Sequence, residues 1–175
     1  MFNKLELEIS CVHCLQSSQN EIYPLINGNK DSKAKEMIMN EELFLYYCPH
    51  CGYYQPILYE CIYYDEKLKY LVVLSKHGKE LLRKIDFDIS EYDIYFVSEV
   101  QEMKEKIIIK EHNLDNQVIE IMKQNIRNSY TNKSSYDLVL SKDISCFEMI
   151  YPNNEIIKTI AFDFTTYQKL LNLSN

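Results

Sequence analysis

The chain has 175 residues and a mass of 20.9 kDa, which is enough for one domain or two small ones. Hydrophobic residues make up 46% and charged residues 26%, a composition typical of globular proteins and unlike that of disordered or fibrous chains. Lys and Arg total 19 against 26 Asp and Glu, and the net charge of −7 argues against a protein that follows nucleic-acid phosphates.

The start of the chain and its apolar runs predict a cytoplasmic protein with no membrane span. Residues 1–10 contain no apolar core of the kind that a secretory signal requires. The apolar runs elsewhere are far shorter than the ~20 residues that cross a bilayer. In a reducing cytoplasm, paired cysteines are more often metal ligands or redox centres than structural disulfides. The abundance of Ile, Lys, Asn and Tyr is typical of an AT-rich microbial genome and favours a prokaryotic source.

Residues 1–79 are predicted to form a β-rich module with a helical insert. Residues 5–9 alternate apolar and charged side chains, which predicts a half-buried strand that leads into a first cysteine pair. A helix is expected over 32–42, capped by Asp31 or Ser32. β-Branched and aromatic residues predict three further strands, at 43–47, 53–64 and 69–75. The polar Asp-Glu-Lys sequence between the last two makes them a hairpin.

Residues 80–175 are predicted to contain two helices, a β-hairpin and a short terminal helix. The first helix begins at a capping box of Ser98 and Gln101, with apolar residues at helical spacing. The second begins at Asp115 and carries Lys123 and Arg127 in its last turn, where cations suit the helix dipole. The remaining elements are a hairpin of residues 145–150 and 156–164, turning at 152–154, and a helix over 165–171. We expect this part to pack on the first, giving one α+β protein.

Two Cys-x-x-Cys pairs are the strongest chemical signal in the sequence: Cys11/Cys14 and Cys48/Cys51. A two-residue gap lets both sulfurs of a pair face one point, and four thiolates match a tetrahedral structural zinc site. Gly52 follows the second pair, where the backbone often needs a positive φ angle. The 33 residues between the pairs exceed the spacing of a simple zinc ribbon, so the insert is expected to carry its own helix. The sequence therefore predicts one Zn²⁺ ion, held by these four cysteines in a zinc-ribbon-like module.

Two alternatives for the cysteines stay open. Cys-Pro-His-Cys also occurs in thiol oxidases, where a helix N-terminus depresses the thiol pKa, so a thiol-disulfide redox protein is one alternative. That mechanism requires a helix after the motif, whereas the residues after Cys51 are predicted to form a strand. Two local disulfides are the other alternative, which a reducing compartment disfavours. Cys61 and Cys146 are expected to be buried, inert thiols. His13 and His50, inside the pairs, are expected to point away from the metal.

These motifs resemble the CpXC family, a prokaryotic family defined by two such cysteine motifs. The resemblance rests on residues 11–14, on the intervening helix, and on Leu43 and Phe44 leading to residues 48–52. It continues through the hairpin and into the predicted helices, so that it covers residues 5–128. The resemblance implies zinc binding, no assigned biological role and no catalytic residue.

The leading functional hypothesis is a non-catalytic zinc-binding protein that binds another protein. Eight tyrosines gather around the second cysteine pair and the hairpin after it: Tyr46, Tyr47, Tyr53, Tyr54, Tyr59, Tyr63, Tyr64 and Tyr70. Tyrosine is enriched in interface hot spots because it offers apolar area and a polar tip. Ordinary cross-strand pairing within a small sheet explains the same pattern, so the sequence leaves core and interface open.

A nucleic-acid-binding zinc ribbon is the main alternative, because exposed aromatic rings can stack on bases. The acidic composition argues against it, and the basic run of Lys30, Lys33 and Lys35 suits a solvated helix face. An enzyme is not expected, since the sequence has no glycine-rich phosphate loop, no His-Glu-x-x-His helix and no Gly-x-Ser-x-Gly turn. Four thiolates also leave zinc no open coordination position. The oligomeric state stays open.

Overall fold

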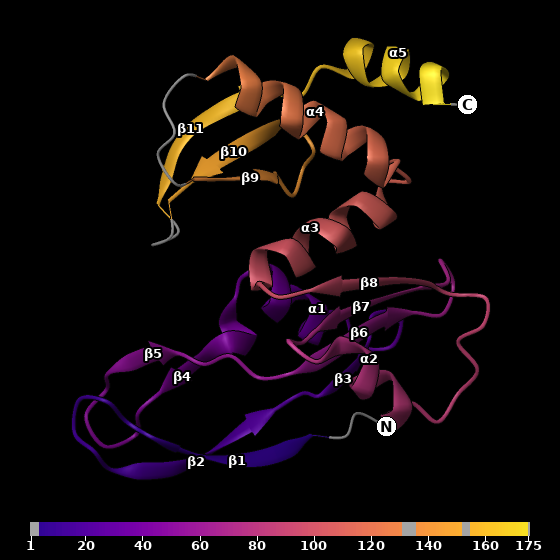
Figure 1. The fold of residues 1–175 in the computed structure, drawn as a ribbon. Helices are drawn as coiled ribbons and strands as arrows, with labels where there is room; N and C mark the ends of the chain where they lie inside the picture. Colours follow the sequence, from indigo (N-terminus) through magenta and orange to yellow (C-terminus); the bar gives the residue numbers. More distant parts are fainter. Residues whose placement is uncertain (1–3, 131–135, 152–154, 175) are drawn as a thin grey trace. The chain divides into compact units, whose positions relative to one another are not determined.

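A computed structural model describes residues 4–130, 136–151 and 155–174 and shows a mixed α+β protein, as predicted (Figure 1). The chain forms two compact units, of which the first ends at Met103 and the second begins at Lys104. The first unit contains the region of the predicted 1–79 module and extends beyond it. No helix in these described ranges is long and apolar enough to cross a membrane.

Two short hairpins carry the cysteine pairs. β1 (Leu5–Ser10) pairs antiparallel with β2 (Ser17–Ile22), and β4 (Leu45–Tyr47) pairs antiparallel with β5 (Tyr54–Pro56). In Figure 1 the loops of both hairpins lie at the same end of the first unit. The sequence did not predict β2, because all its residues except Ile22 are polar and lack the apolar alternation of a half-buried strand. The two hairpins form the predicted zinc-ribbon-like module.

β1 is a strand, as predicted, but it is more exposed than its alternating pattern indicates. Leu5 and Leu7 are 53% and 42% exposed, whereas Ile9 on the same face is buried. Ile9 packs beside the cysteine loops with Tyr46 and two of the cysteine side chains. A two-stranded ribbon is too narrow to form a stable hydrophobic layer by itself. The core of this module therefore lies at its cysteine end.

A four-stranded sheet forms the rest of the first unit. Its strand order is β3-β6-β7-β8, with β3 at Leu25–Asn27, β6 at Cys61–Asp65, β7 at Tyr70–Leu74 and β8 at Asp93–Val97. β6 and β7 form the predicted hairpin, whereas β3 and β8 join it by parallel pairing. All five residues of β7 are buried. The prediction of a single strand over 53–64 is wrong, because this segment forms two strands, β5 and β6, which belong to different sheets.

Short helices connect these strands. α1 (Ser32–Met39) begins as predicted, with the Asp31 carboxylate accepting a hydrogen bond from the Ala34 N–H at 2.8 Å. A 3₁₀ turn, η1 (Glu42–Phe44), then leads into β4. α2 (Gly78–Leu81) and a second 3₁₀ turn, η2 (Leu82–Lys84), lie between β7 and β8. The insert between the cysteine pairs thus carries its own helix, as its length predicts.

Two long helices, a three-stranded sheet and a terminal helix follow. α3 (Val100–Glu111) crosses from the first unit into the second, and α4 (Asn116–Ser129) begins at the predicted Asp115 cap. The sheet order is β11-β10-β9, with β9 at Asp137–Leu140, β10 at Cys146–Ile150 and β11 at Ile156–Ala161. β10 and β11 form the predicted hairpin, whose predicted turn at 152–154 lies outside the described residues. α5 (Phe164–Ser174) is the predicted terminal helix, with more turns than expected.

The capping box predicted for α3 is wrong in one of its partners. The Glu102 carboxylate, and not the Gln101 amide, accepts hydrogen bonds from the N–H groups of Ser98 and Glu99, at 3.0 and 3.3 Å. Gln101 instead donates to Glu41 at 2.6 Å. α3 begins at Val100, so the third helical position, where a capping box places its carboxylate, is residue 102.

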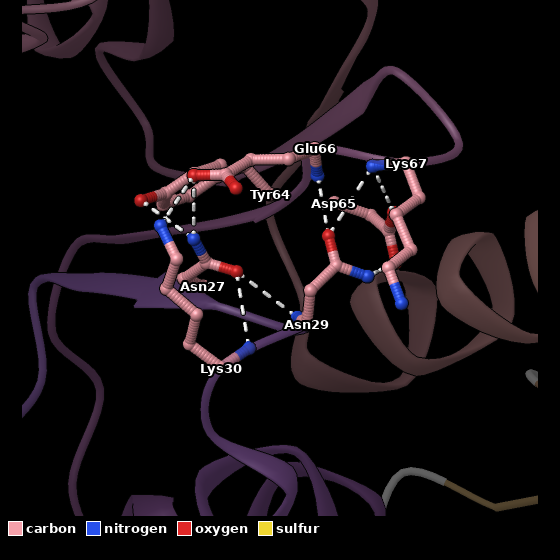
Figure 2. Close-up of polar contacts among 7 residues, drawn as sticks. All are labelled: Asn27, Asn29, Lys30, Tyr64, Asp65, Glu66 and Lys67. Atoms are coloured by element: carbon pink, nitrogen blue, oxygen red, sulfur yellow. Dashed lines mark hydrogen bonds and ion pairs between the residues drawn. The ribbon is translucent and has the colours of Figure 1, made fainter.

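A polar network joins the end of β3 to the β6–β7 turn (Figure 2). The buried Asn27 side chain accepts from the N–H groups of Asn29 and Lys30, and its amide donates to the Tyr64 hydroxyl and the Glu66 carboxylate. The side-chain oxygen of Asn29 accepts from the Glu66 N–H at 2.7 Å, and its side-chain NH₂ group donates to the Asp65 carboxylate at 2.8 Å. Every member of this network has hydrogen-bond partners, so it stabilises two loops and is no open binding site.

Asn27→Ala is expected to lower the free energy of unfolding by about 1–3 kcal/mol, because the loop N–H groups then lose their acceptor in a buried place. Urea denaturation followed by circular dichroism measures the loss. Gln19→Ala, at an exposed position of β2, is the control and should change stability by less than about 0.5 kcal/mol. Equal stability of the two variants would contradict a structural role for the network.

Candidate metal centre

The two cysteine pairs lie in loops with the same backbone hydrogen bonds. The N–H of the first cysteine donates to the carbonyl five residues later, at 2.9 Å for Cys11 and 2.8 Å for Cys48. The carbonyl of the same cysteine accepts a hydrogen bond from the N–H four residues later, at 2.9 Å for Cys11 and 3.0 Å for Cys48. Each loop therefore curls back on itself in the same way, and this curl brings both sulfurs of a pair to one side.

The residue after each pair has a left-handed backbone. φ is 72° at Gly52, as predicted, and 62° at Leu15, which the sequence did not indicate. A left-handed conformation costs a residue with a side chain roughly 1–2 kcal/mol. Leu15 is also 80% exposed, so its side chain contributes little packing in return. The first loop thus adopts the geometry of the second although it lacks the glycine.

The four sulfurs form one cluster. All four Sγ atoms of Cys11, Cys14, Cys48 and Cys51 lie within 4.8 Å of one another. Cys11 Sγ is 3.7 Å from Cys51 Sγ, and Cys14 Sγ is 3.6 Å from Cys48 Sγ, so both of these contacts join one loop to the other. A tetrahedral zinc site with metal–sulfur bonds of about 2.3 Å places its sulfurs about 3.8 Å apart. All four are free thiols, so the structure brings the predicted ligands together without a disulfide.

Four thiols this close cannot ionise independently. Burial opposes ionisation of the Cys48 thiol, but the N–H groups of His50 and Cys51 and the neighbouring thiols outweigh it and lower its pKa to about 6. The Tyr53 N–H favours the Cys51 thiolate, but burial and the other three thiols raise the pKa of Cys51 to about 12. Thiolates at this separation repel one another, and a bound cation removes that repulsion. The donor set therefore fits a divalent metal ion.

A family model described as CpXC protein matches residues 9–123, which is more than half of the chain. The chain belongs to the CpXC family. The matched range includes all four clustered cysteines, so the resemblance predicted from those motifs is confirmed. No curated protein and no solved structure matches this CpXC chain.

Two histidines and two further cysteines of the CpXC chain lie outside the sulfur cluster. His13 stacks on a tyrosine ring, and His50 Nε2 lies 3.4 Å from the Ser17 carbonyl oxygen. The group of possible metal ligands found among the described residues includes neither histidine. Cys61 is completely buried, and this burial raises the pKa of its thiol to about 12, in agreement with the predicted inert thiol. Cys146 is only half-buried, unlike the prediction.

The eight tyrosines do not form one group. The buried core contains Tyr46, Tyr63 and Tyr70. Two more are half-buried, Tyr59 and Tyr64. The remaining three are exposed: Tyr47, Tyr53 and Tyr54. Successive side chains of a strand point to opposite faces, so Tyr46 of β4 is buried while Tyr47 is 63% exposed. Cross-strand packing thus explains part of the tyrosine pattern, and an exposed surface contains the rest.

The exposed tyrosines and His13 form an aromatic row, defined as His13, Tyr53, Tyr54 and Tyr47. The ring centroids are 5.3 Å apart from His13 to Tyr53, 6.2 Å from Tyr53 to Tyr54, and 6.0 Å from Tyr54 to Tyr47. The row connects the two hairpins, because His13 lies in the first cysteine loop and the tyrosines flank the second. A metal ion that joins the two loops would also hold these rings in place. The sequence identified the three tyrosines but not His13.

Proposed function

We propose that this CpXC protein is a non-catalytic module that binds one structural Zn²⁺ ion and uses the surrounding surface to bind another protein. The aromatic row is the observation that carries this proposal. Tyr54 is 62% exposed and Tyr47 63% exposed, so this pair of neighbouring rings presents aromatic surface to solvent. Exposed tyrosines of this kind are frequent among the residues that dominate protein interfaces.

The sulfur cluster supports zinc as a structural ion. Thiolate is a soft ligand, and a four-thiolate tetrahedron is typical of structural zinc sites. Four protein ligands leave no coordination position for water or substrate, which supports a non-catalytic role. The cytoplasmic location predicted from the sequence is part of this proposal, because a reducing compartment keeps such cysteines available as metal ligands.

The distribution of charge favours a protein partner over a nucleic acid. Residues 5–29 and 36–66, which include both hairpins and the aromatic row, contain no Lys and no Arg. A surface that binds nucleic acid needs cations to replace the counterions of the phosphates. The acidic residues here would repel them.

The backbone around the second cysteine pair also disfavours a thiol-disulfide redox function. In thiol oxidases with the Cys-Pro-His-Cys motif, the N-terminus of a helix helps to lower the thiol pKa. Cys48 and Cys51 instead lie in the loop between β4 and β5. The lowered pKa of the Cys48 thiol fits a metal ligand as well as a redox thiol.

Affinity capture with purified protein tests the proposed function. The wild type should retain a reproducible protein partner from lysate of the source cells, and the double variant Tyr53→Ser/Tyr54→Ser should retain about tenfold less. Tyr151→Ser is the matched control, because Tyr151 is 40% exposed and lies in the second unit. Zinc content must stay equal in all three proteins. Capture of no reproducible partner, or equal capture by the double variant, would contradict the proposal.

A further inference from the structure

We propose that the groove between β2 and β4 binds an extended, cationic segment of the partner protein, and that this segment pairs with the outer edge of β2. This inference rests on the proposed function and specifies the chemistry of its partner. It is carried by the shape of the groove, by the strand edge that borders it and by its charge.

The groove lies within the first unit and has a volume of about 600 Å³. One wall is β2, with Gln19, Asn20 and Glu21, and the other includes Leu45 and Tyr47 of β4. Its size suits a few residues of an extended chain. Tyr47 also belongs to the aromatic row, so the groove and the row form one continuous surface.

β2 presents its backbone edge to the groove. Side chains of a strand alternate between two faces, so three consecutive residues can border one groove only along the strand edge. Among the described strands, β2 pairs with β1 alone. Two carbonyl oxygens of β2 lie near side-chain nitrogens, that of Ser17 at 3.4 Å from His50 Nε2 and that of Glu21 at 3.1 Å from Asn20 Nδ2. The other N–H and C=O groups of the outer edge are of the kind that bind an added strand in β-augmentation.

β4 contributes side chains to the opposite wall. Leu45 and Tyr47 are two residues apart, so they point to the same face of β4 and toward the groove. Tyr46 between them points to the core and is buried. An extended segment paired with β2 would place alternate side chains over Leu45 and Tyr47, which gives such an interface its specificity.

The charge of the groove selects a cationic segment. The exposed Glu21 and Glu42 both line it, and Glu6 lies directly opposite Glu21 in the β1–β2 pair. Lys4 contacts this groove, with its Nζ 2.8 Å from the Glu21 carboxylate and 5.2 Å from the Tyr23 ring centroid. Tyr23 is itself a lining residue. The carboxylate of Glu21 and the ring of Tyr23 thus hold one ammonium group, that of Lys4. The carboxylate of Glu42 is a second acidic group of the groove, and it can pair with a cation of the partner.

Fluorescence anisotropy with synthetic peptides tests the inference. The probe is a labelled decapeptide that alternates arginine with valine, which favours an extended chain. Wild-type protein should bind it about tenfold more tightly than the peptide with glutamate in place of arginine, and more tightly than an oligo-dT strand of about 20 nucleotides. N-methylation of alternate peptide amides on the side that pairs with β2 should abolish binding.

Variants of the groove locate the binding. Glu42→Gln/Tyr47→Ser should weaken peptide binding about tenfold while zinc content and melting temperature stay unchanged. Asp86→Asn is the charge-matched control, because Asp86 is an exposed carboxylate elsewhere in the first unit, and it should bind as the wild type does.

Four results would overturn the inference. Equal peptide binding by the groove variant excludes this site, and tighter binding of oligo-dT indicates nucleic acid as the occupant. A dimer in sedimentation experiments that the groove variant dissociates indicates a second copy of the chain. If the peptides do not bind but the aromatic row still captures a protein partner, the groove inference fails while the proposed function stands.

Discussion

Cys48→Ser is expected to abolish metal binding and to unfold the two cysteine hairpins. The buried cluster at this end of the ribbon consists of Ile9, Cys11, Tyr46 and Cys48, so half of its members are proposed ligands. Structural zinc contributes an apparent free energy of about 10–16 kcal/mol. A whole domain is stable by only about 5–15 kcal/mol. Loss of one ligand therefore removes more stabilisation than the small apolar cluster can supply.

Metal analysis and amide hydrogen exchange measure this effect. Protein purified without added metal should contain about one zinc ion per chain in the wild type and almost none in Cys48→Ser. Exchange protection should be lost in β1, β2, β4 and β5, while α4 and the β9–β11 sheet stay protected, since they belong to the second unit. Cys146→Ser is the control and should keep the metal. Wild-type zinc content in Cys48→Ser would show that the four cysteines are not the ligands.

Lys123→Met is expected to lower the free energy of unfolding of the second unit by about 3–5 kcal/mol. Lys123 Nζ lies 2.7 Å from the Glu105 carboxylate, and the two side chains are only 8% and 3% exposed. Removal of the cation leaves the carboxylate buried without its counter-charge. The Glu105 carboxylate also accepts a hydrogen bond from the Leu140 N–H at 2.9 Å, which ties α3 to β9.

Urea denaturation of matched variants separates the parts of this network. The double variant Glu105→Leu/Lys123→Met removes both charges and should recover much of the stability, because apolar pairs often replace buried ion pairs well. A deficit of about 1–3 kcal/mol should remain, since the Leu140 N–H loses its acceptor. Glu120→Gln, which alters a 43% exposed carboxylate beside Lys123, should cost no more than about 1 kcal/mol. If Lys123→Met were as stable as Glu120→Gln, the pair would contribute little.

Lys123 also illustrates a prediction that failed for a physical reason. Lys123 and Arg127 were both predicted to lie in the last turn of α4 and to interact with the helix dipole. Arg127 lies in that turn, whereas the structure buries Lys123 earlier in the helix, against Glu105 of α3. The helical pattern of α4 was predicted correctly. The choice between solvent and a carboxylate on another helix depends on packing between elements, which the sequence of one helix does not contain.

The sequence by itself determined the features that depend on interactions between neighbouring residues. The Cys-x-x-Cys spacing, the left-handed Gly52, and the caps at Asp31 and Asp115 each involve a few neighbouring residues, and each was predicted. The membership of the CpXC family follows from the same local motifs. The tertiary structure alone decided which tyrosines are exposed, that the polar β2 borders a groove opposite β4, and that β3 and β8 join the sheet in parallel. These features depend on contacts between segments far apart in the chain, where burial and hydrogen-bond pairing outweigh the preferences of any single segment.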